Sequence, residues 1–114
     1  MLISMPRGDI REVQFTVYNN TGQEPSDIQF DEIYVTFKTS TNATEYLFQK
    51  KLTDGTITEE DVGVYQFRIE SADTDGLKIG KYAFDIELVY GQDIKQTTVG
   101  VLDITPEVTF VVNE

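Results

Sequence analysis

Carboxylates are the most abundant reactive side chains of this 114-residue chain, which has 20 Asp and Glu but no Cys and no His. Without Cys or His it cannot assemble a Ser-His or Cys-His nucleophile, a His-ligated zinc site or an imidazole acid–base pair. Glycoside hydrolysis needs two carboxylates facing each other across a cleft, but no such pair stands out. We therefore expect no catalytic residue, no cofactor and no metal ligand, and a protein that is not an enzyme.

The segment Asp73-Thr74-Asp75-Gly76 is a candidate ion site, because calcium prefers hard oxygen ligands. In an EF-hand alignment the first ligand position falls on Ser71 and the twelfth on Tyr82, where a Glu is needed. The segment also differs from the Asp-Thr-Gly of aspartic proteases, because Asp75 intervenes before Gly76. The sequence predicts a solvated turn at Asp73 and Asp75 rather than a metal site.

A second motif, Arg7-Gly8-Asp9, spells the tripeptide that cell-adhesion receptors recognise on an exposed loop tip. Pro6, Gly8 and Asp9 lie between two apolar runs and are typical turn residues. We therefore interpret the motif as an ordinary structural turn.

Four tyrosines are candidates for an aromatic platform that binds sugars or a partner protein. They are Tyr18, Tyr34, Tyr46 and Tyr90. Tyr34 alternates with the apolar Ile33, Val35 and Phe37, so it should point away from the core. We expect it to be the most exposed of the four.

The formal net charge of −11 repels phosphate backbones and anionic lipid headgroups. No apolar run approaches the roughly 20 residues that cross a bilayer, and residues 1–7 do not resemble a secretion signal. The absence of Cys fits synthesis in a cytosol. We expect a soluble protein with no nucleic-acid and no membrane partner.

Apolar residues alternate with polar ones over many short runs, which is the pattern of half-buried strands. Turn residues bound these runs, for example Asp54-Gly55 and Gly91-Gln92-Asp93. The predicted strands cover residues 2–5, 10–18, 32–38, 45–52, 63–70, 80–90, 94–104 and 108–112. These runs, with no linker between them, predict one domain over residues 1–114, an all-β, immunoglobulin-like antiparallel β-sandwich of about seven strands.

The clearest core signal is the pattern Gly-x-Tyr-x-Phe-x-Ile-Glu, which begins at Gly63 and again 17 residues later at Gly80. Because side chains alternate between the faces of a strand, its apolar members share one face. We predict that Phe67, Ile69 and the equivalent Phe84 and Ile86 are buried.

Two segments resemble a tyrosine corner, in which a Tyr hydroxyl bonds to backbone a few residues upstream. Asp61-Val62-Gly63-Val64-Tyr65 matches the Asp-x-Gly-x-Tyr form, and Leu77-Lys78-Ile79-Gly80-Lys81-Tyr82 looks similar. At least one of these two tyrosines should be structural.

The run 108–112, Val-Thr-Phe-Val-Val, is rich in strand formers and follows Pro106, where the preceding strand should stop. It either pairs with the domain's own edge, beside residues 2–5, or adds to another chain. We favour the second and predict a homo-oligomer through the terminal strands. Its association should strengthen as salt screens the negative charge.

Six segments together resemble a known family: Met5-Pro6-Arg7-Gly8-Asp9, Val13–Val17, Glu32–Phe37, Tyr46–Leu52, Tyr65-x-Phe67-x-Ile69 and Asp73–Ile86. Through these residues the chain resembles small structural proteins of phages and prophages of Gram-positive bacteria, and is similar to the N-terminal domain of phage upper baseplate proteins. The resemblance implies a virion or assembly role through contacts with other virion or assembly proteins. It also implies location in the virion after synthesis in the host cytoplasm.

Two other classes of function remain open. A bacterial cell-surface or carbohydrate-binding module would show a row of exposed aromatic side chains. A hydrolase based on carboxylates would show a cleft with two acids of unequal pKa.

Overall fold

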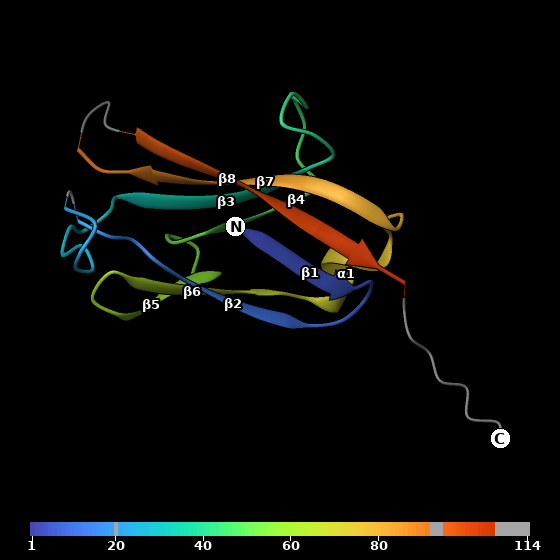
Figure 1. Ribbon diagram of the computed structural model, residues 1–114, viewed down its shortest axis with the longest axis horizontal. Helices are drawn as coiled ribbons and strands as arrows, with labels where there is room; N and C mark the ends of the chain where they lie inside the picture. Colours follow the sequence, from blue (N-terminus) through green and yellow to red (C-terminus); the bar gives the residue numbers. More distant parts are fainter. Residues whose placement is uncertain (20, 92–94, 107–114) are drawn as a thin grey trace, which may run out of the picture.

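Eight β-strands and one short helix make up the computed structural model, which describes residues 1–19, 21–91 and 95–106 (Figure 1). The strands are β1 (Leu2–Pro6), β2 (Arg11–Thr16), β3 (Glu32–Lys38), β4 (Phe48–Lys51), β5 (Ile57–Asp61), β6 (Val64–Ile69), β7 (Gly80–Val89) and β8 (Lys95–Thr105). The helix α1 (Ser71–Asp75) connects β6 to β7. Across the described ranges, no helix is long and apolar enough to cross a membrane.

The strands form two sheets that face each other (Figure 1). One has the order β1-β8-β7-β3-β4 and the other β2-β6-β5. In immunoglobulin nomenclature β2, β5 and β6 take the places of strands B, D and E, while β3, β7 and β8 take those of C, F and G. The predicted all-β, immunoglobulin-like sandwich is confirmed.

One pairing departs from the wholly antiparallel arrangement predicted from the sequence. β1 lies parallel to β8, with Leu2 opposite Val101 and Pro6 opposite Thr105. A parallel pair needs a long connection, and the intervening strands provide it. The local alternation that predicts a strand carries no information about such a distant partner, so the five-stranded sheet is mixed.

The sequence-based assignment also missed β5, because only Ile57 of this edge strand is buried while Thr58 to Asp61 are exposed. Its sequence therefore lacks the alternation of a half-buried strand, and its pairing with β6 defines it. The predicted run 45–52 is shorter in the structure, with β4 beginning at Phe48. The predicted run 108–112 lies outside the described residues.

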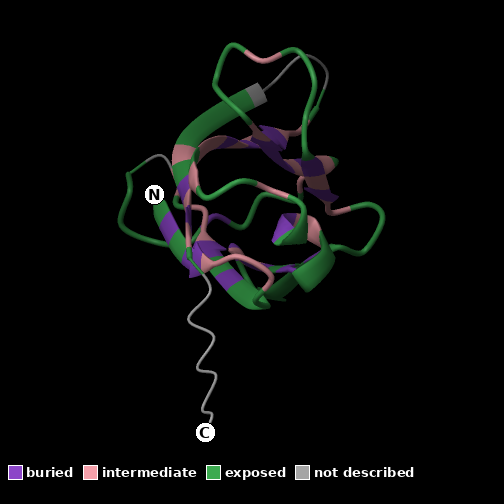
Figure 2. Ribbon diagram, turned by 90° about the vertical axis from the view of Figure 1, so that its right-hand side faces the viewer, coloured by how far each residue is buried: buried purple, intermediate pink, exposed green. Residues whose placement is uncertain are grey.

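The core lies between the two sheets, and strands of both sheets carry buried residues (Figure 2). Phe67, Ile69, Phe84 and Ile86 are at most 7% exposed, as the repeated pattern predicts. Phe37 is at the centre, with its ring centroid 5.2 Å from that of Phe84 and 6.1 Å from that of Phe67. The core thus joins both sheets through aromatic contacts.

The tyrosine corner forms at Tyr82, at the start of β7. Its hydroxyl donates a hydrogen bond to the carbonyl oxygen of Lys78, at 2.5 Å. Tyr65, the better match to the sequence motif, is 2% exposed and packs its ring on Phe15. Burial, followed by the charge of Glu59, raises the pKa of the Tyr65 phenol. Tyr65 is therefore a core residue, and Tyr82 fixes the crossover.

The two tyrosines should respond differently to loss of the hydroxyl. Tyr82→Phe is expected to lower the free energy of unfolding by about 0.5–1.5 kcal/mol, because it removes one hydrogen bond. Tyr65→Phe should stay within about 0.5 kcal/mol of the parent, since it keeps the buried ring packed on Phe15. Urea denaturation of both variants measures the difference. A larger loss for Tyr65→Phe would place the corner at Tyr65.

Candidate functional site

The Arg7-Gly8-Asp9 motif forms the turn between β1 and β2 and is packed against the α1 region. The Gly8 backbone N–H donates to Thr74 Oγ1 at 2.9 Å, and Arg7 Nη1 donates to the Leu77 carbonyl at 3.3 Å. Gly8 has a φ of 82°, which favours glycine in this turn. The motif therefore forms a turn, as predicted, in which Arg7 and Gly8 are partly buried.

Asp73 and Asp75 lie in α1 rather than in the predicted turn. Asp73 Oδ2 accepts hydrogen bonds from Lys50 Nζ and from the Glu70 backbone N–H, both at 2.7 Å. The Lys50 side chain is only 9% exposed, because β4 directs it inward beside Phe48. The Asp73 carboxylate therefore neutralises a buried ammonium group and connects α1 to the five-stranded sheet.

Because Asp73 already binds Lys50 and the Glu70 backbone N–H, we predict that calcium does not stabilise the protein. An ion stabilises a fold only through its affinity for the native state, and Asp73 already holds an ammonium group. Within the described ranges, no group of three or more acidic side chains is placed to hold a metal ion. The melting temperature should stay constant on addition of millimolar calcium. A rise of several degrees that Asp75→Asn abolishes would contradict this expectation.

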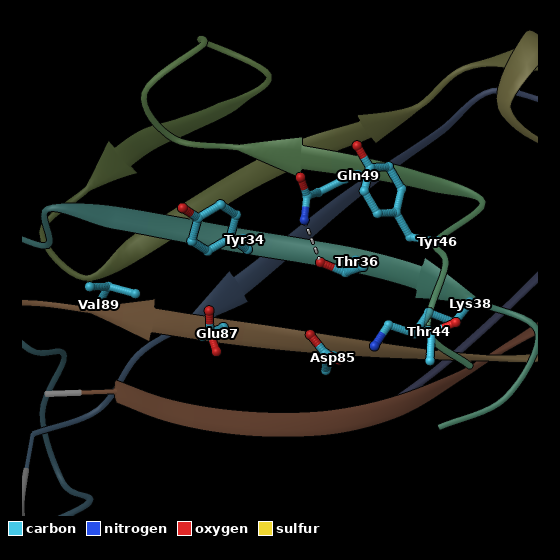
Figure 3. Close-up of a pocket in the computed structure, with 9 residues that line it drawn as sticks. All are labelled: Tyr34, Thr36, Lys38, Thr44, Tyr46, Gln49, Asp85, Glu87 and Val89. Atoms are coloured by element: carbon cyan, nitrogen blue, oxygen red, sulfur yellow. Dashed lines mark hydrogen bonds between the residues drawn. The ribbon is translucent and has the colours of Figure 1, made fainter. Parts of the chain in front are cut away.

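The four candidate tyrosines do not form one platform. Tyr34 and Tyr46 line a shallow groove on the outer face of the five-stranded sheet (Figure 3). Tyr18 and Tyr90 line a separate hollow, where Tyr90 packs against Phe30. Tyr18 and Tyr46 are each 57% exposed, whereas Tyr34 is partly covered. The prediction that Tyr34 is the most exposed is wrong, because the Lys51 side chain extends over its ring.

The outer-face groove measures about 450 Å³ and is mostly polar. Its lining includes Tyr34, Thr36, Tyr46, Gln49, Asp85 and Glu87. Gln49 Nε2 donates to Thr36 Oγ1 at 2.9 Å, which orients the amide across β4 and β3. Asp85 and Glu87 lie side by side on β7 (Figure 3). They occupy one wall, so they do not face each other across a cleft as glycosidase carboxylates do.

A second depression is an apolar cleft of about 300 Å³ between the two sheets. Its lining includes Phe15, Val17, Phe84, Ile86, Leu88 and Thr98. Phe84, Ile86 and Leu88 of β7 form one wall and belong to the core. Phe15 and Val17 on the β2 side form the opposite wall. Thr98 faces inward on β8, opposite Ile86, yet it is exposed. The cleft therefore opens to solvent beside the first half of β8.

The edge of β8 along this cleft has no partner strand among the described residues. β8 has eleven residues, but β1 pairs only with Val101 to Thr105. The Val101 N–H donates to the Met1 carbonyl, away from β7. Backbone groups alternate in direction along a strand, so Thr97 and Val99 point their N–H and C=O groups to the same side. Such a row of open groups is a template for another strand.

Sequence reasoning did not identify this edge, although one signal for it was present. The predicted strand 94–104 is more than twice as long as the predicted strand 2–5, which pairs with it in the structure. A short strand cannot cover a long neighbour, so part of β8 had to remain open or find another partner.

The chain was compared with protein-family models and with curated proteins, and none of them matches it.

Proposed function

We propose that this protein is a non-catalytic component of a phage or prophage particle, where it binds other virion or assembly proteins. The open edge of β8 above the apolar cleft carries this proposal. An unpaired edge next to accessible core side chains is completed by an extended polypeptide, which supplies hydrogen bonds to the edge and side chains to the cleft.

The charge and the resemblance support the same proposal. A net charge of −11 disfavours nucleic acid and membrane surfaces as partners. The resemblance to phage structural proteins adds the particle as the location, after synthesis in the host cytoplasm. The acids that the fold brings together, Asp85 and Glu87, lie along one strand, which fits a binding surface better than an acid–base pair.

Particles purified from the host provide the test. Mass spectrometry should find the chain in them at a stoichiometry comparable to other structural proteins. Thr98→Lys places a charge in the cleft and should lower incorporation at least tenfold. Thr41→Lys adds the same charge at an exposed position in the loop between β3 and β4 and should leave incorporation unchanged. Absence of the parent chain from purified particles would contradict the proposal.

The outer-face groove favours a second candidate function, a carbohydrate-binding module. Tyrosine rings stack on pyranose faces, while Asp85, Glu87 and Gln49 offer hydrogen-bond groups to hydroxyls. The chain has no Trp, so tyrosine emission reports binding of soluble cell-wall oligosaccharides directly. Tyr46→Ala should abolish a saccharide-induced change, whereas Tyr18→Ala, which removes an equally exposed ring outside the groove, should not. No emission change with the parent protein would exclude this candidate.

A further inference from the structure

We propose that the cleft and the open edge of β8 receive residues 108–112 of a second copy of this chain as an added strand. The inference rests on the proposed function, since it names the partner that occupies the same surface. The acceptor site consists of the backbone of Thr97 and Val99 and the apolar cleft wall formed by Phe84, Ile86 and Leu88.

β1 shows what an added strand needs at this edge. It pairs with the second half of β8 and directs Ile3 and Met5 inward, where they are 3% and 2% exposed. Leu2 and Ser4 alternate with them and are exposed. An occupant of the first half of β8 therefore needs apolar side chains at alternate positions, facing Phe15 and Val17 on the opposite wall of the cleft.

Residues 108–112 satisfy this requirement. Their sequence is Val-Thr-Phe-Val-Val, with Val108, Phe110 and Val112 at alternating positions. In an extended strand these three side chains share one face. A cleft of about 300 Å³ is of the order of one large aromatic side chain with aliphatic neighbours, so Phe110 is the expected anchor.

Chain length excludes insertion of this segment into its own molecule. β8 ends at Thr105, and a strand seated beside residues 96–100 would begin next to Gly100. Five residue-to-residue steps along β8 separate Gly100 from Thr105, a distance of about 17 Å. The three steps from residue 105 to residue 108 span at most about 11 Å. The segment therefore reaches the cleft of another copy but not its own.

Electrostatics sets the salt dependence of this contact. Each copy carries a formal charge of −11, so two copies repel each other until salt screens the repulsion, with a Debye length of about 8 Å at 0.15 M. Association should strengthen from low salt to 0.15 M.

Reciprocal exchange of residues 108–112 between two copies closes a dimer, whereas one-way insertion builds a linear chain of copies.

Full-length variants and a peptide test the proposal. Light scattering should show that the parent chain self-associates at 0.15 M salt and that Phe110→Asp is monomeric with an unchanged melting temperature. A fluorescent peptide of residues 107–114 should bind the Phe110→Asp protein with a saturable rise in anisotropy. The same peptide carrying Phe110→Asp should not bind.

Two lysine variants, each combined with Phe110→Asp, locate the binding site. Thr98→Lys, inside the cleft, should weaken peptide binding at least tenfold, while Thr41→Lys, at an exposed position in the loop between β3 and β4, should leave it unchanged. Absence of peptide binding, or equal weakening by both lysines, would overturn the proposal. If the chain is nevertheless abundant in purified particles, the function proposed above stands and only the identity of the partner is wrong.

Discussion

Replacing Phe84 with alanine is expected to lower the free energy of unfolding by about 3–5 kcal/mol. Phe84 is 2% exposed and stacks obliquely on Phe37, with ring centroids 5.2 Å apart. On β8 the opposite residue is Gly100, where an added Cβ would come within 2.4 Å of the Phe84 ring. The ring thus fills a space that no neighbour can enter without moving, so its removal leaves a cavity.

Urea denaturation measures this loss, which is a large share of the 5–15 kcal/mol that stabilises a typical domain. Tyr46→Ala is the control, because it removes an aromatic ring that is 57% exposed on the outer side of the same fold. It should change the free energy of unfolding by no more than about 0.5 kcal/mol. A denaturation midpoint for Phe84→Ala equal to that of the parent would mean that the faces of β7 are assigned the wrong way round.

Asp73→Ala is expected to lower the free energy of unfolding by about 2–4 kcal/mol, because it leaves the buried Lys50 ammonium group without its carboxylate. The Lys50 and Asp73 side chains are 9% and 18% exposed, so solvent reaches the pair only partly. The substitution also removes the acceptor for the Glu70 backbone N–H at the start of α1. Both losses act on the connection between α1 and the sheet.

Asp75→Ala is the matched control, since it removes the same charge from the same helix at an exposed position. It should stay within about 0.5 kcal/mol of the parent. The double variant Lys50→Met with Asp73→Ala should recover part of the stability lost in Asp73→Ala, because no buried charge remains. Equal, small losses for Asp73→Ala and Asp75→Ala would show that the ion pair does not stabilise the fold.

The sequence by itself determined which side of each main strand faces the core. The positions predicted as buried, Phe67, Ile69, Phe84 and Ile86, are all buried, because side-chain alternation is a local property of an extended backbone. The sequence also determined that the chain has no thiol or imidazole side chains and that it has a strong negative charge. These properties depend on residue types and on neighbours one or two positions away.

The tertiary structure alone decided which strands become neighbours and where a surface stays open. The parallel pairing of β1 with β8 and the ion pair of Lys50 with Asp73 join residues that are far apart in the sequence. The cleft beside β8 exists because the five-residue β1 covers only part of an eleven-residue strand. The alternation of side chains within one strand does not reveal this difference in length. The energy of strand pairing depends on a partner strand that comes close only when the whole chain folds.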